Sequence, residues 1–119
     1  MNWTLDKSRP VCPQIEEILC VMIATGELKG GDKLFSVREV ALKASVNPNT
    51  VQKAFESLES KMLLTSVRGS GWYVNDDVSR AMEIVDGLKR QKTREYVEGM
   101  LHLGVNKEEI TEYIKEWNK

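Results

Sequence analysis

The stretch SVREVALKASVNPNTVQKAFESLESKMLLTSVRGSGWYV occupies residues 36–74 and decides the expected fold. It opens with Ser36, followed three residues later by Glu39, a pair that caps a helix start reciprocally. Asn47 and Pro48 mark the start of a second helix, because Asn is a preferred cap and Pro is tolerated at the first helical position. Only about three residues separate the two predicted helices, which is the spacing of a helix-turn-helix.

A β-hairpin is expected directly after the second helix. Leu64–Val67 and Trp72–Val74 are short runs with strand-forming side chains, and the four residues Arg68 to Gly71 form the turn between them. A helix-turn-helix that is followed by such a hairpin, which is called the wing, is typical of a winged helix-turn-helix. The expected fold class is therefore mainly α with a small β-hairpin, with a head at residues 1–75 and a two-helix tail at residues 76–119.

The flanks of this stretch complete the expected head. Residues 1–9 are interpreted as an arm, with Trp3 and Leu5 docking on the body, and Pro10 and Pro13 precede a helix over residues 14–25. Gly26 is expected to close that helix. The helix that starts at Asn47 carries an apolar stripe at helical spacing, which we expect to be buried: Val51, Ala54, Phe55, Leu58 and Met62.

The tail has a helical pattern over residues 78–103, followed by a helix that Asn106 and Glu109 cap. Residues 89–95 are entirely polar, which leaves open whether the first tail helix is continuous. Two short amphipathic helices cannot bury both apolar stripes on each other and need either the head or a second copy. The alternative is a tail that packs only on its own head, and we expect a homodimer instead. The residues expected to mediate dimerisation are Val78, Met82, Val85, Tyr96, Met100, Ile110, Ile114 and Trp117.

Composition is that of a folded protein, with 119 residues, 41% hydrophobic and 29% charged. The net charge of −1 does not favour nucleic acid, but the charges are unevenly distributed. Residues 33–74 hold six basic and three acidic side chains, whereas residues 76–119 hold ten acidic and eight basic. We expect a cytoplasmic protein, because no apolar run can span a bilayer and no signal peptide is recognisable. Cys12 and Cys20 are expected to be reduced thiols, Cys20 in the core.

The polar residues at the start of the second helix suit a DNA-reading role. A recognition helix places its N-terminal residues at base edges and phosphates, where Asn and Gln pair with adenine and Arg with guanine. Asn47 alone is better explained as a cap. An Arg in the first turn of the preceding helix and an Arg-Gly pair at the wing tip lie beside the same face. The expected DNA-binding residues are Ser36, Arg38, Asn47, Asn49, Thr50, Gln52, Lys53, Arg68 and Gly69.

Residues 10–74 resemble the DNA-binding domain of GntR-family transcription regulators. The resemblance rests on an ordered set of motifs that begins with Gly26-x-Leu28-x-x-Gly31-Asp32-x-Leu34 and Ser36-x-Arg38-x-x-Ala41. It continues with Val46-Asn47-x-x-Thr50-Val51 and ends with Gly69-x-Gly71-x-Tyr73-Val74. It implies a sequence-specific regulator, a dimeric repressor that reads a pseudo-palindromic operator through the DNA-binding residues named above.

The short helical tail resembles that of the YtrA-like subfamily, in which it is a dimerisation device. Two positions depart from the family pattern. Phe35 stands where members usually have Pro, and Met62 stands where they often end the recognition helix with Gly. A non-glycine residue in a left-handed cap is costly, so the exit of this helix is expected to differ.

Other classes of function have less support. A winged helix that binds protein or RNA without an operator is the alternative reading. An enzyme is not expected, because His102 is the only histidine and no nucleophile, carboxylate pair or phosphate loop is recognisable. No cofactor or metal is indicated. A small-molecule effector is left open, although nothing in the sequence of the tail marks a pocket.

Overall fold

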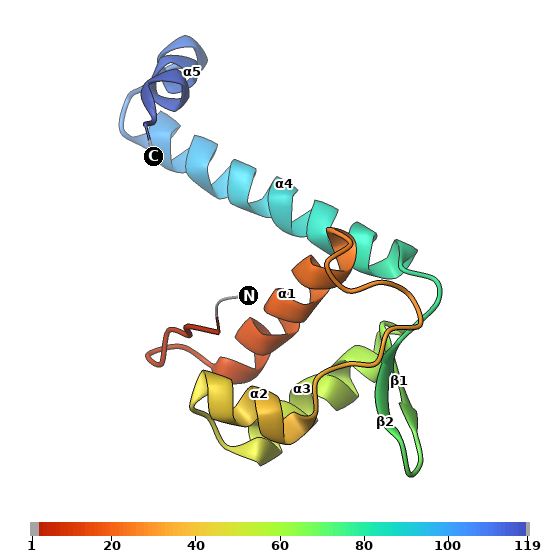
Figure 1. Cartoon of the computed structure of the whole chain (residues 1–119). Helices are drawn as coiled ribbons and strands as arrows, with labels where there is room; N and C mark the ends of the chain where they lie inside the picture. Colours follow the sequence, from red (N-terminus) through yellow and green to blue (C-terminus); the bar gives the residue numbers. More distant parts are fainter. Residues whose placement is uncertain (1–2, 119) are drawn as a thin grey trace. The chain divides into compact units, whose positions relative to one another are not determined.

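The computed structural model describes residues 3–118, so Met1, Asn2 and Lys119 of the expected arm and tail lie outside it. The described elements are, in order, helices α1 (Val11–Ala24), α2 (Val37–Ala44) and α3 (Pro48–Ser60), strands β1 (Leu64–Val67) and β2 (Gly71–Val74), and helices α4 (Ser79–His102) and α5 (Lys107–Glu116) (Figure 1). The chain forms two compact units, an N-terminal unit up to Val85 and a C-terminal unit from Asp86. The mainly helical fold with one hairpin is the expected class. The two units meet within α4, between Val85 and Asp86, which is ten residues beyond the boundary after residue 75 that we expected from the sequence.

The core of the N-terminal unit lies where α1 and α2 both pack on α3. Apolar side chains at helical spacing converge there, which is why the three helices bury one common core. Phe55 of α3 is fully buried, and its ring meets Trp72 of β2 edge to face at 5.6 Å between centroids. The largest fully buried side chains are Ile15, Leu19, Val40, Val51, Phe55, Leu58 and Leu64. Helix α3 is therefore held on one side by two helices and on another by the wing.

The helix starts follow local capping rules. Ser36 and Glu39 form the expected capping box at α2, and the Asn47 side chain accepts the Asn49 N–H at α3. Helix α1 begins at Val11, so the prediction that it starts at Gln14 was wrong. Pro13 lies inside its first turn, where an absent N–H costs nothing because first-turn amides have no helical acceptor.

The exit of α3 corrects a second prediction. Met62 was expected in the buried stripe, but it follows the end of the helix and its side chain is 70% exposed. Met62 has φ 68°, and the Leu63 N–H returns to the Leu58 carbonyl at 2.9 Å. This is the left-handed exit that glycine usually provides. The expectation of a different exit was therefore wrong, since Met62 adopts the strained conformation itself.

The wing is an antiparallel hairpin whose register pairs Leu64 with Val74 and Val67 with Gly71. The turn therefore comprises three residues, Arg68 to Ser70, instead of the four expected, because Gly71 already belongs to β2. Residues 31–34 add a further edge to β2, with the Leu34 N–H on the Trp72 carbonyl at 2.8 Å and the Val74 N–H on the Asp32 carbonyl at 2.8 Å. Backbone bonds thus fix the wing to the segment that leads into α2.

Gly30 lies where two backbone segments meet. A Cβ atom at this position would lie 2.5 Å from the carbonyl oxygen of Asp76, in the link between the wing and α4. Real side chains do not approach a backbone that closely, so only glycine fits there. The loop after α1 and the exit from the wing are therefore in direct contact.

In the tail, α4 is one continuous helix through the polar residues 89–95. Intrahelical pairs support this stretch: Arg90 with Asp86 at 2.9 Å and Gln91 with Glu95 at 3.0 Å. Asn106 and Glu109 form the expected capping box at α5. The predicted apolar stripe of α5 is mostly exposed, because Ile110 is buried whereas Tyr113, Ile114 and Trp117 are more than half exposed.

No helix within residues 3–118 has the length and apolarity that a membrane crossing requires. The same residues contain no group of three or more metal-binding side chains. Cys20 is buried, as expected, and burial raises its pKa to about 11. Cys12 is partly buried, and burial also raises its pKa. Both thiols are therefore protonated at neutral pH and poor nucleophiles.

Candidate nucleic-acid interface

The first turns of α3 present a short polar surface. Asn49 and Lys53 are exposed, and Thr50 and Gln52 are partly buried. Asn47 is engaged with its own helix, because its side-chain oxygen accepts the Asn49 N–H at 2.7 Å. The Gln52 amide donates to Glu56 at 3.3 Å within the same helix. Asn49, Thr50 and Lys53 are thus the members of this group whose side chains make no hydrogen bond or ion pair within residues 3–118.

The start of α2 presents a hydroxyl and a guanidinium. Ser36 accepts the Glu39 N–H at 3.0 Å through its side-chain oxygen, which leaves the hydroxyl hydrogen available to a phosphate. The Ser36 N–H bonds the Glu39 carboxylate at 3.0 Å and holds the pKa of that carboxyl below its ordinary value. Arg38, in the first turn, is exposed and makes no ion pair among residues 3–118. Its charge is therefore available to an external anion.

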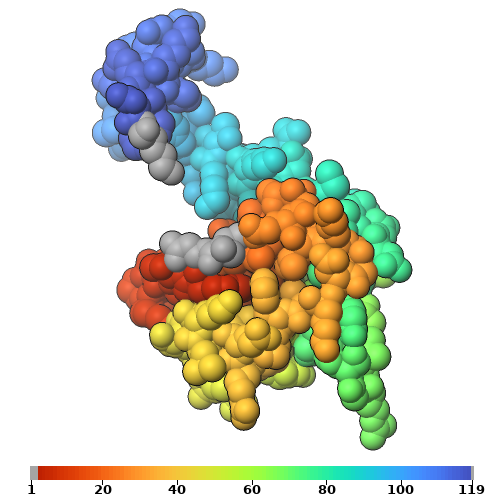
Figure 2. All heavy atoms as spheres, in the orientation of Figure 1, coloured from red at the N-terminus to blue at the C-terminus, as the bar shows by residue number. Residues whose placement is uncertain are grey.

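The wing tip carries the third group of expected contacts. Arg68 is exposed, and Gly69 has φ 78° with open space where a side chain would be. The wing projects from the body of the N-terminal unit (Figure 2). A hollow of about 520 Å³ lies between the wing and the start of α2, lined by Ser36, Val37, Ser70 and Gly71 among others. The two elements therefore border one concave surface.

Glu59 fixes the wing to the recognition helix, a contact that the sequence does not reveal. Its carboxylate accepts the Ser66 N–H at 3.0 Å and the Ser66 hydroxyl at 2.8 Å, and these bonds hold its pKa below the ordinary value. On the opposite side of α3, Glu16 of α1 accepts Ser57 at 2.7 Å and Lys61 at 2.8 Å. Both glutamates join elements that only the folded chain brings together.

Lys33 is a further basic residue that the sequence does not single out. It pairs with Tyr73 in an isolated β-bridge and lines the hollow between α2 and the wing. Its side-chain Cε would lie 3.5 Å from a Cβ atom at Gly71. A lysine in an extended link has no recognisable pattern, so only the fold shows that it lies beside Ser36 and the wing.

The comparisons with known proteins agree on one class. The family model described as "Bacterial regulatory proteins, gntR family" matches residues 13–74. The chain belongs to the GntR family. It is therefore a DNA-binding transcription regulator, and its relatives are regulators, not enzymes.

Two relatives from Bacillus subtilis align along nearly the whole GntR chain. The uncharacterized HTH-type transcriptional regulator YhcF is 39% identical and covers 97% of this chain and 95% of its own. The HTH-type transcriptional repressor YtrA is 33% identical and covers 92% of this chain and 85% of its own. The expected resemblance to YtrA-like regulators is thereby confirmed.

Solved structures extend the likeness to the fold. A GntR family transcriptional regulator from Listeria monocytogenes is 38% identical with a TM-score of 0.86, and the match covers 96% of this chain and all of that one. The DNA-binding domain of AraR, solved in complex with operator ORE1, is 30% identical with a TM-score of 0.54 and covers 56% of this chain and 80% of its own. The winged helix-turn-helix of this GntR protein is thus shown.

The departure at Phe35 has a local explanation in this GntR chain. The Phe35 ring meets Trp3 edge to face at 6.1 Å, and the Lys43 ammonium lies over it at 5.7 Å from the centroid. Trp3 is buried and Leu5 packs against the core, so the arm docks as expected. An aromatic residue at position 35 thus gives the arm a partner that proline cannot provide.

The residues expected to mediate dimerisation differ in exposure. Val85 is buried in the core of the N-terminal unit, Val78 packs against that core, and Ile110 is buried in the C-terminal unit. These three already have partners within the chain. Met100 is partly buried, and the remaining four are exposed: Met82, Tyr96, Ile114 and Trp117.

Proposed function

We propose that this GntR protein is a homodimeric repressor that binds a pseudo-palindromic operator in the cytoplasm. The observation that carries the proposal is the concave surface that the start of α2 shares with the wing, together with the polar first turn of α3. In this proposal Asn49, Thr50 and Gln52 reach base edges, and Lys53 and Arg68 reach phosphates or the minor groove. Its relative YtrA is named a transcriptional repressor, which supports the same direction of regulation.

The remaining expected contacts have defined parts in this proposal. Arg38 reads a guanine edge or pairs with a phosphate, for which its planar guanidinium is suited. Ser36 donates its hydroxyl to a phosphate, and the N-terminal end of α2 adds the positive end of its dipole. Gly69 lets the wing backbone approach the duplex closely. Asn47 contributes by capping α3.

The proposed dimer rests on apolar surface in the tail. Ile114 and Trp117 are 59% and 75% exposed, and Leu103 is 75% exposed, all within the C-terminal unit. A second copy that covers these side chains would remove them from water, at about 25 cal/mol for each Å² buried. Two heads would then read half-sites about 34 Å apart, or one helical turn of DNA.

The first experiment selects random genomic DNA fragments with the full chain at two salt concentrations and sequences them. An enriched inverted repeat supports a dimeric operator-binding regulator. Enrichment that contains single half-sites only contradicts the dimer. Recovery of nothing enriched contradicts operator binding by the unliganded chain and favours the alternative, a winged helix that binds protein or RNA.

Oligomeric state is tested separately by light scattering after size-exclusion chromatography. Ile114→Glu is expected to yield monomers, because a charge would be buried in the interface. Leu42→Glu is the matched control, since Leu42 is 75% exposed but lies on α2. Equal masses for the wild type and Ile114→Glu would contradict the proposed interface.

The proposal includes a small-molecule effector, for which one observation is specific. The C-terminal unit contains a hollow of about 560 Å³ lined by Lys89, Arg90, Thr93, Arg94, Val97 and Lys107. Arg90 pairs with Asp86, but Lys89, Arg94 and Lys107 form no ion pair within residues 3–118. Three unneutralised cations around one hollow favour an anionic ligand.

Operator binding can be measured with citrate and with inorganic phosphate to test this site. A change in affinity that Arg94→Gln abolishes, and Lys115→Gln does not, supports an anionic effector there. Lys115 is a suitable control because it is basic and exposed in the same unit but lies outside the hollow. Equal responses from both variants would contradict the site.

A further inference from the structure

The N-terminal arm, residues 3–9, reaches the turn that joins α2 to the recognition helix. The Lys7 ammonium donates to the carbonyl oxygen of Ala44 at 2.9 Å and to that of Ser45 at 2.8 Å. Ala44 ends α2, and Ser45 begins the turn that leads to the cap of α3. A side chain 37 residues away in sequence thus binds the corner of the helix-turn-helix.

The two carbonyls that Lys7 binds are groups that a helix cannot satisfy by itself. The last carbonyls of an α-helix have no intrahelical donor, and they form the negative end of its dipole. The Val46 N–H is directed back to the Ala41 carbonyl at 3.0 Å, so it does not serve the carbonyls of Ala44 and Ser45. Those two carbonyls therefore accept from another donor. A lysine ammonium has three hydrogens and a full positive charge, so it suits both carbonyls.

The turn at this corner is strained, which makes an external support significant. Ser45 has φ 56° and ψ 50°, a left-handed conformation that is unfavourable for a non-glycine residue. The Lys7 contact lies on the Ser45 carbonyl itself. Asn47 follows two residues later and caps α3, so the angle at which α3 leaves the corner depends on this turn.

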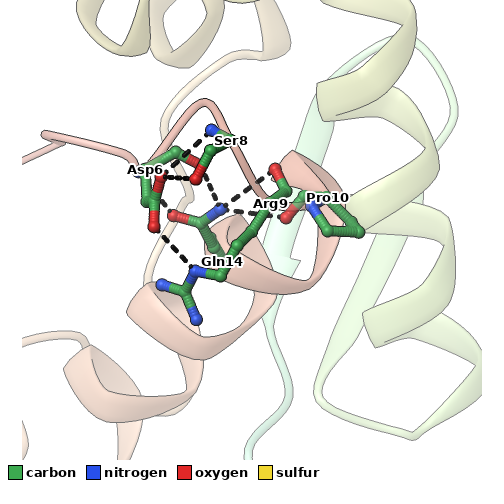
Figure 3. A network of polar contacts seen from close by, with 5 residues as sticks. All are labelled: Asp6, Ser8, Arg9, Pro10 and Gln14. Carbon is green, nitrogen blue, oxygen red and sulfur yellow. Dashed lines mark hydrogen bonds and ion pairs between the residues drawn. The ribbon is translucent and has the colours of Figure 1, made fainter.

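The arm is itself rigid on both sides of Lys7. Asp6 accepts the Ser8 N–H at 3.0 Å, the Ser8 hydroxyl at 2.6 Å and the Arg9 Nε at 2.9 Å, and the Ser8 bonds hold its pKa below the ordinary value (Figure 3). Gln14 of α1 clamps the Asp6 backbone from both sides, accepting its N–H at 2.8 Å and donating to its carbonyl at 2.8 Å. Trp3, buried against Phe35, anchors the other end.

We propose that Lys7 is a positioning residue for DNA reading, which holds the α2–α3 corner and so sets the orientation of the recognition helix. The arm acts as a strap: α1 and the core fix its two ends, and Lys7 transmits that position to the corner. Lys7 acts through α3 and does not contact DNA. The inference rests on the proposed placement of α3 against DNA.

The test compares Lys7→Met, Lys7→Arg and the control Lys29→Met in the full chain. Met keeps the aliphatic stem and removes the ammonium, and Arg restores donors to the carbonyls. Lys29 is an exposed lysine of the same unit whose side chain lies outside the strap and the concave surface, so its loss reports the effect of net charge alone. Dissociation constants are measured for the selected operator duplex and for a scrambled duplex over a range of salt concentrations.

Lys7→Met is expected to weaken operator binding about tenfold, a coupling typical of residues that do not touch the ligand. Binding to the scrambled duplex should change no more than in Lys29→Met, the salt slope should stay unchanged, and Lys7→Arg should restore most of the operator affinity. Equal weakening on both duplexes with a smaller salt slope would overturn the proposal, because it identifies Lys7 as a phosphate contact. Unchanged operator affinity would overturn it too.

Amide hydrogen exchange in the free protein provides a readout that does not depend on DNA. Lys7→Met should accelerate exchange of the Ser45 and Val46 amides, which close the end of α2, while Lys29→Met leaves them as in the wild type. If the Ser45 and Val46 amides of Lys7→Met exchange as in the wild type, the proposed role of Lys7 is overturned, whatever the DNA-binding result. If the wild-type chain enriches no DNA fragment in the selection experiment, the proposed function is contradicted instead. Failure of the proposed function and failure of the role of Lys7 can therefore be distinguished.

Discussion

Replacing Met62 with glycine should stabilise the protein. Met62 has φ 68°, in the left-handed region that costs a non-glycine residue about 1–2 kcal/mol. Glycine removes that strain but adds an entropic cost of about 0.5–1 kcal/mol. The Met62 side chain is 70% exposed, so its removal sacrifices little buried surface. The expected net gain is about 0.5–1 kcal/mol in the free energy of unfolding, or about 2–5 °C in the melting temperature.

The backbone contacts at this position should survive the substitution. The Met62 N–H bonds the Glu59 carbonyl at 3.0 Å, and the Met62 carbonyl accepts the Asn75 side-chain amide at 2.6 Å. Neither bond involves the side chain. The gain should therefore appear as a higher urea midpoint with an unchanged slope, measured by circular dichroism.

Met82→Gly is the matched control, because it makes the same chemical change at an exposed position inside α4. There glycine has no strain to relieve and should cost about 1 kcal/mol. Opposite signs at positions 62 and 82 would support the reasoning. A lower midpoint in Met62→Gly would refute it, since that result means the left-handed exit carries no strain.

Three further predictions concern the interface. Arg38→Ala should weaken specific operator binding by about 1–3 kcal/mol and leave scrambled DNA little affected, and unchanged affinity in a binding titration would remove Arg38 from the site. Arg68→Ala should lower affinity for all sequences and reduce the salt slope by about one unit, whereas a sequence-selective loss would indicate base reading. Glu59→Gln should remove stability that the wild type has above the ordinary glutamate pKa of 4.5, because the folded pKa lies lower and the contribution is lost as pH falls through it. Urea titrations at several pH values around 4.5 should show the unfolding free energies of the two proteins converging as the pH falls. A difference that stays constant with pH would contradict the role of the Glu59 carboxylate in holding the wing.

Local signals predicted most of the helices and the hairpin. The capping boxes at Ser36 and Asn106 act over three residues, so the sequence contains all that determines them. The helical spacing of apolar residues wrongly placed Met62 in the buried stripe of α3, because that spacing continues from Leu58 past the point where the helix ends. The polar residues 89–95 form helix without an apolar stripe, since their support comes from pairs within the helix.

The candidate site was predictable only in part. Residue type and spacing select Arg38, Asn49 and Arg68 as candidates. They do not reveal whether a side-chain amide already has a partner in the fold, as the Gln52 amide has in Glu56. Lys7 and Glu59 bind backbone groups of elements that the fold brings to them. Such contacts have no sequence pattern, because any donor or carboxylate at the right place in space would serve.

The close approach at Gly30 limits how this protein can vary. A Cβ atom there would meet three backbone atoms of Asp76, none of which can move aside as a side chain does. At Gly87 a Cβ atom meets nothing within 4 Å. A library that randomises both positions and selects for folded protein should therefore return many residues at 87 and glycine alone at 30. Substitution is thus narrowly restricted where the loop after α1 meets the exit from the wing.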